Sequence, residues 1–194
     1  MFFNFICYKN NFFIGINSLF LKQLVLNIMN FIAILVAALI PLVMGFIWYN
    51  PAVFGKVWMR AIGIDPDAVR DEKPNMAAIF GISLLFALML AMSLNPMVIH
   101  QMGISSILQG IKEAEAEGAK IELLVNGVPI DYASRFRTFG HGALHGFICG
   151  LFVAVPIIGT MSLYEKRGFK YIAVTGGYWI VCFMLMGGVI CGWK

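Results

Sequence analysis

Charged side chains are scarce in this sequence of 194 residues. They make up 12% of the chain, while 60% of the residues are hydrophobic and the mean hydropathy is +0.85. A typical soluble domain carries about 25% charged residues. The composition therefore excludes an ordinary soluble globular protein. The net charge of +4 is too small to argue for nucleic-acid binding, and we expect no nucleic acid among the partners.

The familiar motifs of enzymes are also absent. The sequence has no Walker loop, no G-x-S-x-G elbow, no H-E-x-x-H and no acidic pair within an apolar run. Its cysteines include no C-x-x-C pair, and Cys149, Cys182 and Cys191 lie in apolar runs, where cysteine packs as a small hydrophobe. These absences favour a non-enzymatic structural or interaction protein without a cofactor, whose molecular function the sequence does not name. The alternative is a protein that binds a metal or a small molecule within the membrane, as an enzyme or a transporter.

Four long uncharged blocks occupy nearly half of the chain. They run over about 31–49, 76–98, 139–163 and 171–193. Each has 19 to 25 residues. At a rise of about 1.5 Å per residue, a helix of this length crosses a hydrocarbon core of roughly 30 Å. Lipid leaves no partner for unpaired backbone groups, and strand-like alternation is missing. The sequence therefore predicts an all-α integral membrane protein, a bundle of four transmembrane helices in which Pro41 and Pro156 kink their spans.

The connection between the second and third spans, residues 99–138, carries charge of both signs. It is predicted to be a small soluble insert. Ser105 or Ser106 can cap a helix that runs through Glu117 and ends at Gly118.

A hairpin pattern follows within the insert. Residues 121–125 and 128–130 are apolar except for Glu122, and they flank Asn126 and Gly127, the residue pair typical of a two-residue turn. Pro129 cannot donate to a ladder, so its strand is expected at a sheet edge.

Residues 1–28 form an N-terminal extension that lacks the features of a signal peptide. Either they form an interfacial helix around residues 16–26, or they come from translation upstream of a natural start at Met29. We favour the second alternative because Met29 directly precedes the first span. The remaining residues, 29–194, are then a single four-span membrane domain.

The distribution of basic residues predicts the topology. Six of them lie close to span ends in the two short connections: Lys56, Arg60, Lys73, Lys166, Arg167 and Lys170. Because positive charge near span ends favours the cytoplasm, we expect both termini and the insert to lie outside it, in a multi-pass protein of the cell inner membrane. Its expected partners are the lipid bilayer and either a second copy or another membrane protein.

Several short strings in the first and last spans carry a resemblance. They are Trp48-Tyr49-Asn50-Pro51, Phe54-Gly55-Lys56, Trp58-Met59, Gly177-Tyr178-Trp179 and Met186-Gly187-Gly188. With them the sequence resembles the bacterial membrane family catalogued as domain of unknown function 1761, over about 29–63 and 144–194 but not over the insert. The resemblance implies a small four-span inner-membrane protein and supplies no catalytic residues.

Small residues recur at four-residue spacing in every span. The stripes are Ala33, Ala37 and Gly45; Ser83, Ala87 and Ala91; Gly142, Gly146 and Gly150; Gly188 and Gly192. Such stripes allow helices to approach closely in lipid. A ligand slot is the alternative, and tight packing is the favoured interpretation.

The third span contains the candidate metal ligands. His141, His145 and Cys149 recur every four residues and share one ridge of the predicted helix. Imidazole and thiolate suit zinc or copper, and a closed site would need a further donor. The other histidines and cysteines in or near the spans are His100, Cys182 and Cys191. The alternatives are a polar ligand or interhelical contact through His145, or purely structural roles.

Tyr178 and Trp179 in the last span are candidate ligand-binding residues, together with His145. If buried, the phenol and the indole need hydrogen-bond partners. The alternative to a ligand is a hydrogen bond to another helix, with Asn95 and Ser83 as candidate acceptors.

Overall fold

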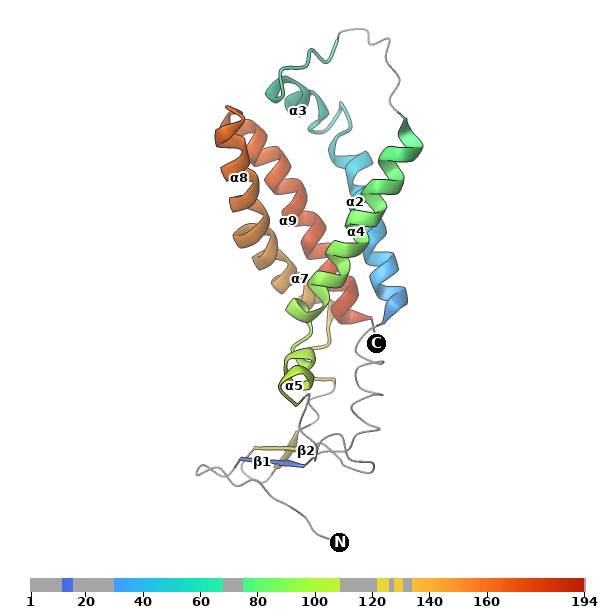
Figure 1. The fold of residues 1–194 in the computed structure, drawn as a ribbon, viewed down its shortest axis with the longest axis vertical. Coiled ribbons are helices and arrows are strands. Elements are labelled where there is room, and N and C mark those ends of the chain that lie inside the picture. The colour runs from blue at the N-terminus through green and yellow to red at the C-terminus, as the bar shows by residue number, and fades with distance from the viewer. Residues whose placement is uncertain are drawn as a thin grey trace. The chain divides into compact units, whose positions relative to one another are not determined.

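The computed structural model describes residues 12–15, 30–67, 75–108, 122–125, 128–130 and 134–193 (Figure 1). The chain divides into two compact units. One, called the helical unit, comprises Phe31–Val98 and Thr138–Lys194. The other, called the insert unit, comprises Met1–Asn30 and Ile99–Arg137. The insert unit therefore combines the N-terminal residues with the connection between the second and third spans.

The helical unit has four helices that are long and apolar enough to cross a membrane. They are α2 (Phe31–Trp48), α4 (Met76–Val98), the third span Phe139–Tyr164 and α9 (Phe169–Gly192). The third span is made of α7 (Phe139–Cys149), the π-helical η1 (Gly150–Ala154) and α8 (Val155–Tyr164). A short helix, α3 (Gly55–Ala61), follows α2. These bounds confirm the predicted spans to within two residues, and the chain is an all-α integral membrane protein.

Helix α9 forms the core of the helical unit. It contacts α2, α4, α7 and α8, and most of its length is buried (Figure 1). The other spans expose large apolar side chains such as Phe86, Phe152 and Leu163. The span with the lowest mean hydropathy, α9, is therefore the one that its neighbours bury most.

Glycines bring α7 and α9 into direct backbone contact. A Cβ at Gly146 would lie 2.6 Å from the carbonyl carbon of Phe183 and would overlap its oxygen. A Cβ at Gly142 would overlap the carbonyl oxygen of Gly187, and Gly150 leaves equally little room against Ile180. The stripe on the third span therefore serves close helix packing, as the favoured interpretation predicted.

Pro156 accounts for the π-helical segment η1. Proline has no backbone N–H, so the carbonyl of Phe152 loses its usual partner, and the ring would also clash with that carbonyl. The helix widens ahead of the proline, and the N–H of Val155 bonds to the carbonyl of Gly150, five residues earlier. Helix α2, in contrast, continues through Pro41 as α-helix.

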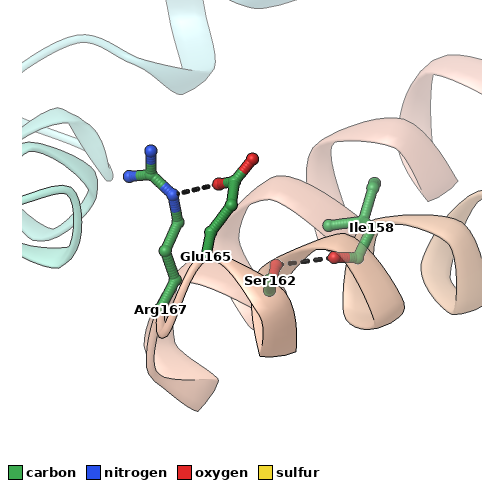
Figure 2. A network of polar contacts seen from close by, with 4 residues as sticks. All are labelled: Ile158, Ser162, Glu165 and Arg167. Carbon is green, nitrogen blue, oxygen red and sulfur yellow. Dashed lines mark hydrogen bonds and ion pairs between the residues drawn. The ribbon is translucent and has the colours of Figure 1, made fainter.

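A tight basic turn joins α8 to α9. Arg167 and Glu165 form an ion pair there, and the hydroxyl of Ser162 donates to the carbonyl of Ile158 one turn earlier in α8 (Figure 2). The backbone N–H of Arg167 donates to the carbonyl of Ser162 at 2.8 Å. The guanidinium of Arg167 also stacks on the ring of Tyr171. The turn therefore fixes a charged residue immediately beside two span ends.

The insert unit contains a three-stranded antiparallel sheet in the order β1-β2-β3. Its strands are β1 (Phe12–Gly15), β2 (Glu122–Val125) and β3 (Val128–Ile130). The pairing of Val125 with Val128 confirms the predicted hairpin. Pro129 lies on the edge strand β3, also as predicted. The pairing of β1 with β2 was not predicted.

The predicted helix start in the insert is wrong. Helix α5 (Gln101–Leu108) begins at Gln101, so Ser105 and Ser106 lie inside it and cannot cap it. The Ser106 hydroxyl instead donates to the carbonyl of Gly103 within the same helix. The amide of Gln101 donates to the carbonyl of Arg135 at 2.7 Å. The predicted helix end at residues 117–118 and the alternative helix at 16–26 lie outside the described residues.

Candidate functional site

The first two turns of α7 carry the two histidines of the third span. The Thr138 hydroxyl caps this helix by accepting a hydrogen bond from the His141 backbone N–H at 3.2 Å. His141 and His145 follow one turn apart, and their ring centroids are 4.6 Å apart. Gly142 and Gly146, each directly after a histidine, face α9. The glycine contacts therefore fix the rotation of α7 and, with it, the direction of both imidazoles.

The two imidazoles, called the His pair, can chelate one ion. A ring nitrogen of His141 and one of His145 lie within 4.8 Å of each other, and both side chains are half-buried. Histidines at i and i+4 on one helix face are a known zinc-binding arrangement. With a zinc–nitrogen distance of about 2.1 Å, two ligating nitrogens in tetrahedral geometry stand about 3.4 Å apart. A small rotation of the side chains brings the pair to this spacing.

Cys149, the third ligand predicted for this ridge, faces a different neighbour. Its thiol contacts the thioether sulfur of Met97 on α4, with the two sulfur atoms 3.7 Å apart. Residues four apart on an α-helix drift by about 40° per step, because one turn takes 3.6 residues. Over the two steps from His141 to Cys149 this drift moves the thiol away from the first imidazole. The structure thus brings together the two histidines and turns the cysteine towards α4.

The aromatic residues of the first connection meet those of the last span. The rings of Tyr49 and Tyr178 have centroids 5.1 Å apart, and Tyr49 also packs edge-on against Trp58 at 5.2 Å. Trp48 packs against Phe54 at 4.6 Å. Strings separated by more than 100 residues in the sequence therefore form one aromatic cluster.

The polar atoms of this cluster bond to the backbone of neighbouring helices. The buried Tyr178 hydroxyl donates to the carbonyl of Pro41 at 2.6 Å, and the Trp48 indole N–H donates to the carbonyl of Val174 at 3.0 Å. Asn95 and Ser83, the predicted acceptors, are not the partners of Tyr178. Trp179 packs edge-on against Tyr178 at 5.1 Å. Interhelical bonding accounts for Tyr178 without a ligand.

Asn95 on α4 is a buried amide that the sequence interpretation assigned only as an acceptor. Its exposed fraction is 1%, and neither side-chain polar atom has a hydrogen-bond partner among the described residues. Leaving such a group unpaired in an apolar interior costs about 1–3 kcal/mol. A polar residue directly before Pro96 in an apolar run was the available signal. Met97 gave no signal, because its contact with Cys149 is tertiary.

These observations define the class of the protein as an integral membrane protein with four apolar spans. The family model described as "Protein of unknown function (DUF1761)" matches residues 32–191, and the chain belongs to this family. The match runs through the insert, so the expectation that the resemblance stops there is wrong. The matched residues include both the aromatic cluster and the His pair. No curated protein and no solved structure matches the chain.

Proposed function

We propose that the protein is a non-enzymatic inner-membrane protein that binds a divalent metal ion of the zinc type. Its ligands are the imidazoles of His141 and His145. The observation that carries this proposal is the approach of one ring nitrogen from each residue to within 4.8 Å on a single helix face. Neutral imidazole is a favoured ligand of zinc. The backbone contacts of α7 hold both rings on that face.

The surroundings of the other polar side chains support a protein without catalysis. Backbone carbonyls of the spans accept the hydrogen bonds donated by the side chains of Tyr178, Trp48 and Ser162. The spans contain no carboxylate that could act as a general acid or base. Among the described residues of the spans, the His pair brings two metal-ligating side chains together on one helix face.

Cys191 on α9 is the further donor that we propose for the coordination. It is buried and lies directly against Gly142, the residue after His141. Structural zinc sites take four protein ligands, whereas sites with three protein ligands keep a position for water. Cys191→Ser tests this donor.

The topology proposed from the basic residues determines which side of the membrane the His pair faces. The insert joins the third span at Thr138, three residues before His141. With the two short connections in the cytoplasm, this end of the span faces away from the cytoplasm, and the His pair takes metal from that side. A cysteine at Asn126 should then react with an impermeant thiol reagent on intact cells, whereas one at Gly168 should not. The reverse labelling would invert the topology.

Zinc titration of the purified full chain tests the proposal. Chelator-stripped protein in detergent should bind one Zn²⁺ per chain in a calorimetric titration, and the His141→Ala/His145→Ala variant should not. The matched control is Leu144→Ala/Ile148→Ala, which alters two exposed residues of α7 that have the same spacing as the two histidines. Zinc binding that survives in the histidine variant, or is absent from the wild type, would overturn the proposal.

A further inference from the structure

The turn between α8 and α9 brings three basic side chains together at the ends of two spans. Lys166 and Arg167 lie in the turn itself, and Lys170 lies in the first turn of α9. We propose that this turn binds the headgroup phosphate of an anionic phospholipid. The turn follows the last residue of the third span, whereas the His pair lies in the first two turns of that span. The proposal therefore does not depend on metal binding.

The charges of the turn leave two lysines for an external anion. The carboxylate of Glu165 pairs with Arg167, whose guanidinium also stacks on the ring of Tyr171 (Figure 2). Lys166 and Lys170 are exposed, and neither forms an ion pair with a described residue. Each lysine ammonium has three donors, and hydrogen bonds from an ammonium to a phosphate are charge-assisted. The two lysines therefore have the charge and the donors that one lipid phosphate requires.

Helix α3 adds positive charge at the same end of the helical unit. It contacts α9, and both α3 and the turn lie at this end (Figure 1). Lys56 and Arg60 are one helical turn apart on α3, and both are exposed. The described acids of the first connection are Asp65 and Asp67. Together with Glu165 they are fewer than the described basic residues at this end, so the electrostatic field here attracts an anionic headgroup.

Apolar side chains beside the turn provide a surface for the acyl chains of the lipid. Leu163, Tyr164 and Phe169 are the most exposed large hydrophobic side chains that the structure describes, with exposed fractions of 73%, 86% and 80%. Aromatic side chains at span ends favour the membrane interface. In the topology proposed above, this end faces the cytoplasm, where the leaflet carries anionic lipids. One lipid can thus contact the lysines with its phosphate and these side chains with its acyl chains.

The backbone at Lys166 provides a substitution that removes a cation without disturbing the turn. Lys166 has a left-handed conformation, with φ of 55°. The N–H of Arg167 donates to the carbonyl of Ser162, and the N–H of Lys166 donates to that of Leu163. These two bonds define a Schellman motif, in which glycine usually occupies the left-handed position because it has no Cβ. Lys166→Gly should therefore keep the turn and remove only the charged side chain.

Lipid titration of the purified full chain in detergent, followed by native mass spectrometry, tests the site. Phosphatidylglycerol should bind more tightly than phosphatidylcholine with the same acyl chains. Lys166→Gly and Lys170→Gln should each weaken phosphatidylglycerol binding about fivefold, the factor that corresponds to about 1 kcal/mol per basic residue near an anionic surface. Lys166→Arg should preserve binding, because it keeps the charge.

Two controls separate lipid binding from folding and from net charge. Without lipid, Lys166→Gly should melt at the temperature of the wild type or above it, since glycine adopts a positive φ without strain. Arg135→Gln removes one positive charge from the insert unit and should bind phosphatidylglycerol as the wild type does.

Three results would overturn the proposal. The first is equal affinity of the wild type for the two lipids, and the second is undiminished phosphatidylglycerol binding by the Lys166→Gly/Lys170→Gln variant. The third is an equal loss of binding in Arg135→Gln, which would show an effect of net charge alone. Glycerol phosphate at the concentration of the lipid should not compete, because it has no acyl chains; full displacement of the lipid would show a site for free phosphate and contradict a lipid site.

Discussion

Replacing Gly146 by alanine should separate α7 from α9. The new Cβ would stand 2.6 Å from the carbonyl carbon of Phe183, whereas ordinary contacts begin at 3.4 Å. The helices must therefore move apart by more than roughly 0.8 Å, the difference between these two values, because the carbonyl oxygen of Phe183 lies closer still. The opposing atoms belong to the backbone and cannot rotate away. Overpacking of this kind costs about 1–3 kcal/mol.

Gly159 provides the matched control on the same span. A Cβ there meets nothing within 4 Å. Gly159→Ala should leave stability unchanged or raise it by about 0.5–1 kcal/mol, because alanine loses less backbone entropy than glycine in a helix. The two alanine variants should consequently differ by about 1–4 kcal/mol in free energy of unfolding.

The assay is unfolding of both variants in the same detergent, followed by circular dichroism. Gly146→Ala should unfold first, and Gly146→Leu should unfold earlier still. Because His145 directly precedes Gly146, a shift of α7 also displaces the His145 imidazole. Gly146→Ala and Gly146→Leu should therefore weaken zinc binding at the His pair. Equal midpoints for Gly146→Ala and Gly159→Ala would refute the packing argument.

Three further predictions concern other parts of the chain. Tyr178→Phe removes the hydrogen bond to Pro41 and should lower stability by about 1 kcal/mol in thermal melts, whereas Tyr164→Phe at an exposed position should have no effect. Asn95→Leu should raise the unfolding free energy by about 1–3 kcal/mol, because it removes an unpaired buried amide; a loss of stability would show that Asn95 has a bound partner. Translation started at Met29 should yield a folded helical unit without β1, and loss of folded protein would contradict this.

The spans and the hairpin were predictable because their signals are local. A run of apolar residues has the length of a bilayer, and Asn126-Gly127 between apolar segments specifies a two-residue connection. The start of α5 was missed because Ser105 and Ser106 resemble caps, whereas the chain already turns into helix at Gln101. The pairing of β1 with β2 joins segments more than 100 residues apart, and no local pattern encodes it.

The candidate site shows the same division. The His pair follows from helical periodicity, because residues four apart share a face whatever the rest of the fold does. The hydrogen-bond partner of Tyr178 could not be predicted from the sequence. Periodicity indicates which face of a helix is buried but not which atom of another helix lies opposite. The carbonyl of Pro41, like the thioether of Met97, becomes a neighbour only when the spans pack.

Zinc-edge X-ray absorption on the zinc-loaded full chain tests the central claim most directly, because it counts the ligands of the bound ion. The account predicts at least two imidazole neighbours at about 2.0–2.1 Å from zinc, and their loss in the His141→Ala/His145→Ala variant. A wild-type spectrum without imidazole scattering would contradict a metal site at the His pair.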